Sequence, residues 1–173
     1  MKKKLIRLAK IILPLLIIFF SFGIFIPSVQ LESKIVLNKP VETSFRVFND
    51  PFQFSEWIPG FKKINWLSGK YNEAGSKWKF TIEKMGIKSE MFNELTAYKP
   101  NELFAFRMEN GALTYDAEVK FIKNGTSSEI ISSSKLQGKN IFWRSLFAVA
   151  KFYFQMQDQE VYNKLKEVIE KTP

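Results

Sequence analysis

The sequence predicts an α+β protein in which a membrane segment precedes one domain of about seven antiparallel strands and a long C-terminal helix. Three observations support this prediction. Residues 11–31 carry no charged side chain, residues 61–136 alternate between polar and apolar side chains in short stretches, and residues 140–171 show helical spacing without glycine or proline. The length of 173 residues and the 46% share of hydrophobic residues suit a single domain, residues 32–173, behind an N-terminal part, residues 1–31.

The N-terminal part has the pattern of a single membrane span. As a helix, residues 11–31 rise about 30 Å, which is enough to cross the hydrocarbon core of a bilayer. Five basic residues lie between Lys2 and Lys10, and no acidic residue occurs before Glu32. The positive-inside rule therefore predicts a cytoplasmic N-terminus and a domain on the outer side, periplasmic or extracellular. A cleaved signal peptide is the alternative, but Ile26-Pro27-Ser28 is a poor match to the small residues of a cleavage site.

The beginning of the domain predicts a strand followed by two short helices. Residues 32–38 alternate around a β-branched centre, which is typical of a strand. Residues 41–48 place apolar side chains at helical spacing. Asp50 is suited to cap a second short helix, which begins at Pro51 and ends near Trp57.

Six further strands follow, because the sequence keeps a period of two between turn signals. Asn110-Gly111 and Asn124-Gly125 are strong signals for two-residue hairpins. The alternation predicts that Glu90 and Glu94 face outward, toward solvent. The expected strands are residues 61–68, 76–85, 87–98, 102–109, 112–123 and 126–136.

The last segment, residues 140–171, predicts one long helix with a broad apolar stripe. Its first half is far more aromatic than its second half. Aromatic side chains there stand beside Lys139, Arg144 and Lys151, a mixture that is favoured at a bilayer interface. Ordinary core packing is the alternative interpretation of these aromatic residues.

Composition excludes several kinds of chemistry. The chain has no cysteine and no histidine, so thiol nucleophiles, disulfides, zinc–sulfur sites and serine–histidine–aspartate catalysis are excluded. No metal motif, no phosphate-binding glycine loop and no nucleic-acid motif occurs, so we expect no cofactor and no nucleic-acid partner. The net charge of +9 falls to +4 without the five basic residues before Ile11, which is a weak argument for nucleic-acid binding.

The order of elements and several short motifs resemble the START/birch-pollen-allergen-like (SRPBCC) superfamily, in particular its polyketide cyclase/dehydrase-like branch. The resemblance covers about residues 32–171. It is carried by Lys39-Pro40-Val41-Glu42, Asp50-Pro51, Trp57-Ile58-Pro59-Gly60, Gly75-Ser76-Lys77-Trp78, Gly86, Glu94, Pro100 and the terminal helix.

This resemblance implies a helix-grip fold, in which a curved antiparallel sheet wraps around the long C-terminal helix. It also implies a cavity between sheet and helix that accepts hydrophobic molecules such as lipids, sterols or aromatic metabolites. It does not imply catalysis, because the superfamily contains carriers and sensors as well as cyclases. Its oxygenase members use a histidine-bearing iron site, which this chain cannot build.

The side chains that face the long helix in such a fold form the predicted cavity lining. Small residues such as Ala117 and Ser132 are expected to leave space there, although ordinary core packing is the competing interpretation. The assignment depends on strand register, because a slip of one residue reverses the two faces. The predicted lining residues are Trp57, Trp78, Phe80, Ile82, Met91, Asn93, Phe106, Tyr115, Ala117, Val119, Ser132, Ser134, Phe147 and Phe154.

Three hypotheses about function follow from the sequence. The leading one is a membrane-anchored protein that binds a hydrophobic small molecule or lipid in this cavity. The second is an enzyme of the cyclase/dehydrase type, which requires an ionisable side chain inside the cavity, with Tyr115 as the candidate. The third is a protein-interaction scaffold, which predicts an exposed apolar patch and no cavity.

Overall fold

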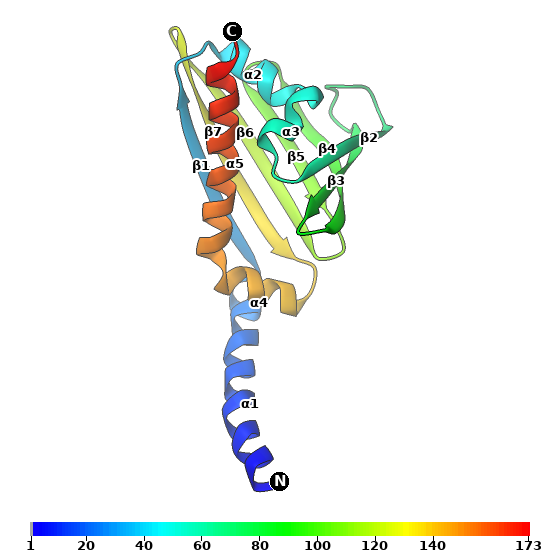
Figure 1. The fold of residues 1–173 in the computed structure, drawn as a ribbon, viewed down its shortest axis with the longest axis vertical. Helices are drawn as coiled ribbons and strands as arrows, with labels where there is room; N and C mark the ends of the chain where they lie inside the picture. Colours follow the sequence, from blue (N-terminus) through cyan, green and yellow to red (C-terminus); the bar gives the residue numbers. More distant parts are fainter. Residues whose placement is uncertain (1) are drawn as a thin grey trace.

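The computed structural model describes residues 2–173, and residue 1 of the predicted N-terminal part lies outside the described residues. A helix projects from one end of a domain in which a seven-stranded antiparallel sheet faces a long helix (Figure 1). The strand order is β1-β7-β6-β5-β4-β3-β2. The elements are α1 (Lys2–Phe25), β1 (Ser28–Leu37), α2 (Val41–Asn49), η1 (Pro51–Gln53), α3 (Phe54–Trp57), β2 (Phe61–Ser68), β3 (Lys77–Lys84), β4 (Ile87–Lys99), β5 (Leu103–Glu109), β6 (Leu113–Asn124), β7 (Ser127–Gly138), α4 (Ile141–Val149) and α5 (Lys151–Lys171).

The apolar helix α1 ends earlier than the uncharged stretch of sequence does. The sequence predicts a membrane segment up to residue 31 and a strand from residue 32, but β1 begins at Ser28. Val29 and Leu31 are buried in the core, whereas Gln30 between them is exposed. The period-two alternation therefore already starts at residue 28, and residues 28–31 belong to the sheet. Pro27, which separates the helix from the strand, suits a helix end.

The six predicted strands after the short helices are confirmed, and so is their antiparallel order. The register places Phe80 opposite Met91, Phe106 opposite Ala117 and Val119 opposite Ser132 on one face. The hairpin at Asn110 differs from the expected two-residue turn. The Asn110 side-chain oxygen accepts the backbone N–H groups of residues 112 and 113, at 2.8 and 3.1 Å, so a three-residue loop joins β5 to β6.

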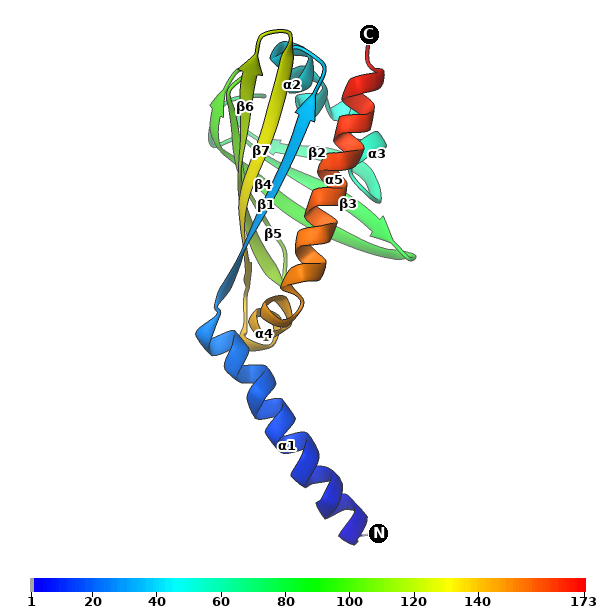
Figure 2. The ribbon, with the colours of Figure 1, turned by 90° about the vertical axis from the view of Figure 1, so that its left-hand side faces the viewer.

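The predicted long C-terminal helix is confirmed as α5, but it begins at Lys151 rather than near residue 140, because a separate helix, α4, precedes it and the two meet at Ala150. This residue has φ −93° and ψ 17°, outside the regular helical region. The Asn140 side chain caps α4 by accepting the N–H of Trp143 at 3.1 Å. Helix α4 packs beside α1 at the end of the sheet, whereas α5 runs along the inner face (Figure 2). Packing against two different partners, rather than a glycine or proline, therefore divides the helix.

Helix α5 is attached to the free edge of strand β1 by side-chain hydrogen bonds. The Gln155 side chain accepts the N–H of Glu32 at 3.0 Å, and the Gln159 side chain accepts the N–H of Lys34 at 3.2 Å. Both glutamines also donate to the carbonyl oxygens of the same strand residues. These bonds satisfy backbone groups that an edge strand otherwise exposes. They hold α5 over the β1 side of the sheet rather than over its centre.

Candidate functional site

A cavity of about 320 Å³ lies between α5, the short helices and the inner face of strands β3 to β6. Its wall is predominantly apolar and rich in aromatic rings. Lys84, at the end of β3, is an exposed member of the wall, whereas Pro59 and Gln157 are half-buried. The wall residues are Leu31, Phe48, Phe54, Trp57, Ile58, Pro59, Trp78, Phe80, Ile82, Lys84, Asn93, Phe104, Phe106, Met108, Leu113, Tyr115, Leu136, Phe154, Gln157, Asp158, Val161 and Tyr162.

The short helices contribute a rigid aromatic group to one side of the cavity. Asp50 caps η1, as predicted, by accepting the N–H of Phe52 at 3.0 Å. The chain then turns so that the Trp57 ring stacks on Phe48, with centroids 5.5 Å apart, and Phe54 packs edge-on against Trp57. Such aromatic pairs add stability beyond the area that they bury. Aromatic packing within the protein therefore shapes this side of the wall.

Three polar atoms of the wall have no hydrogen-bond partner among the described residues. They are the indole N–H groups of Trp57 and Trp78 and the side-chain oxygen of Asn93. Asn93 is 3% exposed, and its amide nitrogen donates to the carbonyl oxygen of Met91 at 2.8 Å. That bond fixes the side chain, and its buried oxygen has no partner among the described residues. Buried polar groups in folded proteins are normally paired, so these atoms are candidate ligand contacts.

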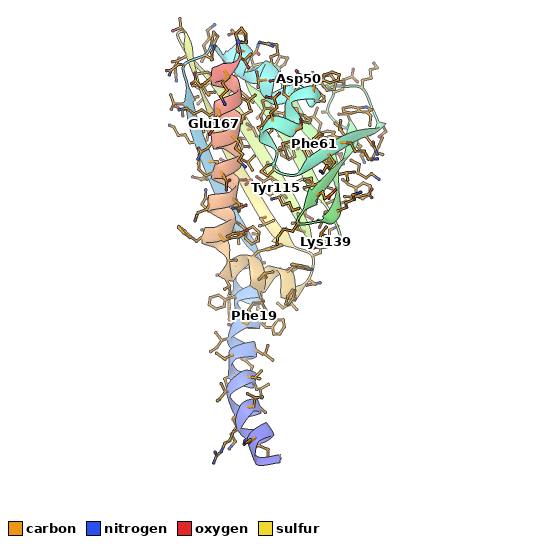
Figure 3. The ribbon with its side chains drawn as sticks, in the orientation of Figure 1. Phe19, Asp50, Phe61, Tyr115, Lys139 and Glu167 are labelled. Atoms are coloured by element: carbon orange, nitrogen blue, oxygen red, sulfur yellow. The ribbon has the colours of Figure 1, made fainter. Side chains whose placement is uncertain are left out.

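A polar cluster occupies the α5 side of the cavity. The Asp158 carboxylate accepts the hydroxyl of Tyr115 at 2.7 Å and the hydroxyl of Ser33 at 2.6 Å. Tyr115, on β6, lies beside α5 in the view of Figure 3, and its bond to Asp158 links the two elements. Burial, reinforced by the nearby Tyr162 and Asp158, raises the pKa of Tyr115 well above its usual value. Burial also raises the pKa of Tyr162. Both phenols are therefore protonated donors at neutral pH.

The structure brings together most of the predicted lining residues of the strands and short helices. These residues lie on strands β3 to β6 or on a helix that faces those strands. Those that lie on the cavity wall are Trp57, Trp78, Phe80, Ile82, Asn93, Phe106, Tyr115 and Phe154.

The other predicted lining residues are buried but lie outside the cavity wall. They are Met91, Ala117, Val119, Ser132, Ser134 and Phe147. The small side chains near Val119 do not leave open space, because Tyr162 and Leu165 of α5 pack into the same cluster. Met91 packs with Trp78 and Phe80 below the wall.

Phe147, at the α4 end, packs edge-on against Phe154 at 5.2 Å and so lies behind the wall. Ser134 is covered as well, and its hydroxyl lies 3.5 Å from the carbonyl oxygen of Leu31.

Sequence reasoning missed the polar residues that α5 places in the cavity, above all Asp158. A signal was present in the sequence. Asp158 stands four residues after Phe154 and three before Val161, so an acid interrupts the apolar stripe of the helix. The predicted outward direction of Glu90 and Glu94 is confirmed, since they form exposed ion pairs with Lys79 at 2.7 Å and Lys77 at 3.4 Å.

Metal-binding geometry is absent from the part of the chain that the structure describes. No group of three or more acidic side chains comes together there, and the sequence supplies no histidine or cysteine.

Comparison with known proteins identifies the fold and the family. The solved structures of Ara h 8.0201 (13% identity, TM-score 0.64, 82% of this chain and 97% of that one) and of truncated norcoclaurine synthase from Thalictrum flavum (12%, 0.62, 84% and 96%) are similar. The di-domain ARO/CYC StfQ of the steffimycin biosynthetic pathway is also similar, at 9% identity and TM-score 0.64, over 81% of this chain and 50% of that one. At such low identity these likenesses show the fold alone, and they confirm the predicted helix-grip arrangement.

A comparison with curated protein sequences gives no significant match. The family model described as polyketide cyclase / dehydrase and lipid transport matches residues 28–170. The match spans β1 to the last turn of α5, which is nearly the whole domain. It agrees with the predicted resemblance, and the chain therefore belongs to the polyketide cyclase/dehydrase and lipid transport family.

Proposed function

We propose that the protein is a membrane-anchored binding protein that holds a hydrophobic small molecule or lipid between the sheet and α5. The observation that carries this proposal is an apolar cavity of about 320 Å³ whose wall includes polar atoms without protein partners. Transfer of apolar surface from water into such a cavity is favourable, and a few polar groups then orient the ligand. The cavity also argues against the scaffold hypothesis, which predicts an exposed apolar patch and no cavity.

The volume of the cavity and the polar atoms of its wall indicate the chemical class of the proposed ligand. Its volume equals that of roughly ten water molecules and lies at the small end of ligand pockets. This size suits a compact ring system or one chain of a lipid. The free oxygen of Asn93 favours a ligand with a hydroxyl or amide donor, and the indole N–H groups of Trp57 and Trp78 favour an acceptor on the same molecule.

Membrane anchoring is supported by α1. The stretch Ile6–Phe25 is long and apolar enough to cross a membrane, and only 6% of its most apolar window is buried. A signal sequence near the N-terminus has the same length and composition, so the mature N-terminus is the decisive observation. Peptide sequencing of the membrane-bound protein should find residues 1–10 still attached.

The orientation of the anchored protein has its own test. Because the chain has no cysteine, a Phe52→Cys variant supplies a single thiol at a site that is 91% exposed. A membrane-impermeant thiol reagent should label it in intact cells. Labelling that requires lysis would place the domain on the cytoplasmic side.

Ligand binding is tested by extracting the purified full-length protein with organic solvent and analysing the extract by mass spectrometry. The matched control is Ile82→Phe, which enlarges a wall residue and fills part of the cavity. We expect an apolar compound that co-purifies with the wild type and is depleted in the variant. Equal extracts from both proteins would contradict the proposal.

The contribution of Asn93 can be measured once the ligand is known. Replacement by leucine keeps the side-chain size and removes the free acceptor. One neutral hydrogen bond contributes about 0.5–1.5 kcal/mol, so Asn93→Leu should weaken binding by up to about tenfold.

The enzyme hypothesis gains one specific observation, the hydrogen bond between Tyr115 and Asp158 inside the cavity. A protonated phenol beside a carboxylate is able to donate a proton to a bound carbonyl, with the carboxylate accepting one in return. The extracted compound, added back to the protein, should then be converted. Tyr115→Phe should abolish conversion while leaving binding in place. Recovery of the compound unchanged from the wild type would rule this activity out for that compound.

A further inference from the structure

The surface made by α4 and the first turns of α5 carries six exposed hydrophobic side chains beside the anchor helix. We call it the α4 face, and its members are Ile141, Phe142, Val149, Phe152, Tyr153 and Met156. Phe152 is 77% exposed and Val149 is 57% exposed. The spacing within each helix places its members on one side. Apolar residues gathered in this way mark an interaction surface rather than isolated surface positions.

We propose that the α4 face lies in the interfacial layer of the bilayer, so that the domain is docked on the membrane as well as anchored to it. The inference rests on the proposed function in one respect, the insertion of α1. It adds a second membrane contact, made by residues that belong to the folded domain. The alternative occupant of the face, a second copy of the chain, is an outcome of the test below.

The contact between α1 and α4 fixes how deep α4 lies. Gly23 of α1 is buried against α4, and a Cβ atom at this position would lie 2.7 Å from the carbonyl oxygen of Ile141 and closer still to the hydroxyl of Ser145. Only a glycine allows the two helices to approach so closely. Phe19 of α1 also contacts Phe142, with ring centroids 6.0 Å apart. The two helices are therefore packed against each other, so that α1 is not joined to the domain by a flexible linker alone.

The apolar part of α1 is just long enough to cross the bilayer, so its contacts with α4 lie at the membrane surface. The 20 residues from Ile6 to Phe25 rise about 30 Å, which matches the hydrocarbon thickness of a bilayer. Gly23 and Phe19 lie about 3 Å and about 9 Å below the end of that span. An α1 that crosses the bilayer therefore carries its α4 contacts to the depth at which interfacial helices lie, about 5–10 Å.

The charges around the α4 face suit a membrane surface with anionic lipids. The sequence between Glu129 and Asp158 contains no acidic residue. Lys139 is paired with Glu109 at 3.0 Å, whereas Arg144 and Lys151 form no ion pair among the described residues. Basic side chains beside aromatic and aliphatic ones are typical of helices that lie in the bilayer interface. A self-association surface has no need for this excess of one charge sign, so the membrane is the better partner.

The experiment uses full-length single-cysteine variants, which the cysteine-free chain makes possible. Phe152→Cys reports on the α4 face, and Ile17→Cys reports on α1. Phe52→Cys is the matched control, because Phe52 is exposed in η1, which directly follows α2 at the end of the domain opposite α1 (Figure 1). Each variant is labelled with an environment-sensitive fluorophore and reconstituted in vesicles of phosphatidylcholine with a minority of phosphatidylglycerol. Quenching is measured with lipids that carry a nitroxide at shallow or deep positions, and with aqueous iodide.

We expect the Phe152 label to be quenched by the shallow nitroxide and to lose quenching by iodide, whereas the Phe52 label shows the reverse. If the Phe152 label is as accessible to iodide as the Phe52 label while the deep nitroxide quenches the Ile17 label, α1 is inserted and the docking inference is wrong. If the Ile17 label is not quenched either, the anchoring proposal fails with it. Protection from iodide without quenching by any lipid nitroxide would identify a second protein copy and also overturn the inference. Met156→Cys replaces Phe152→Cys if the latter melts at a lower temperature than the wild type.

Discussion

The inner face of the sheet has two halves with the same alternating sequence pattern and opposite packing. In the closed half, under α5, Val119 and Ile130 are completely buried, and Leu165 of α5 packs into the same cluster and is completely buried as well. In the open half, which borders the cavity, residues such as Met108 of β5 and Leu113 at the start of β6 are only partly buried and form part of the wall. The difference arises from the position of α5, which Gln155 and Gln159 hold over the β1 edge. The alternation of polar and apolar residues thus determines which side chains point inward. The attachment of α5 to β1 determines which of these side chains pack against the helix.

The largest effect that separates the two halves is the cost of removing a leucine side chain from each. Leu165→Ala in the closed half should lower the free energy of unfolding by about 2–5 kcal/mol, because a tightly packed site cannot relax around the new cavity. Leu113→Ala in the open half should lower it by less than half as much, because one side of Leu113 already borders open space. Urea unfolding of the two full-length variants, followed by tryptophan fluorescence, gives both values. Equal losses would show that the open half is packed as tightly as the closed half.

A smaller effect is expected from pH at the boundary between the halves, where Tyr162 is buried. Its pKa is raised in the folded state, so its contribution to stability is fully present below about pH 10 and is lost as the pH rises through the folded-state pKa. Between about pH 9 and about pH 11 an unfolded tyrosine loses its proton, whereas a tyrosine with a raised pKa keeps it in the folded state. For each such tyrosine the free energy of unfolding should therefore fall by about 1.4 kcal/mol over this range. Tyr162→Phe removes this contribution, while the lysines titrate equally in both proteins. Unfolding curves of the wild type and the variant that keep a constant separation over this range would contradict the prediction.

The smallest effect is expected on the outer face, which the two halves share. Arg107 donates to Asp116 at 2.6 Å between β5 and β6, and both side chains are well exposed. Exposed ion pairs contribute about 0–1 kcal/mol, so Arg107→Ala should change the unfolding free energy by less than about 1 kcal/mol and leave ligand binding unchanged. Asp116→Ala serves as the matched partner variant. A large loss of binding in either variant would mean that this side of the sheet takes part in the site.

The sequence was sufficient to predict the order of the elements and the inward side of each strand. Period-two alternation with Asn-Gly and Gly turns identified the strands, and Trp78, Phe80 and Asn93 were correctly placed on the inner face. The division of the terminal helix at Ala150 was not predictable, because no local signal breaks the helix and the break results from the packing of α4 on α1.

The boundary between the cavity and the packed core could also not be predicted from the sequence. Ala117 and Ser132 share the inward direction of Asn93, but only the lateral position of α5 determines that they are covered. That position depends on glutamine side chains bonded to the edge of β1, whose role is visible only after the fold is assembled. Asp158 shows that a polar residue within an apolar helical stripe is a more useful signal for a site than small residues on a strand.

The most direct measurement is photolabelling of the full-length protein with an apolar probe that carries a diazirine, followed by peptide mass spectrometry. Peptides of α1 are expected to react from the bilayer in every variant and serve as the internal reference. We predict that wild-type protein is also labelled on the β5–β6 peptide with Phe106, Met108 and Leu113, and that Ile82→Phe removes this label but not the label on α1. Labelling of the domain that is confined to the closed half, or that is unchanged in Ile82→Phe, would contradict a ligand-binding cavity in the open half.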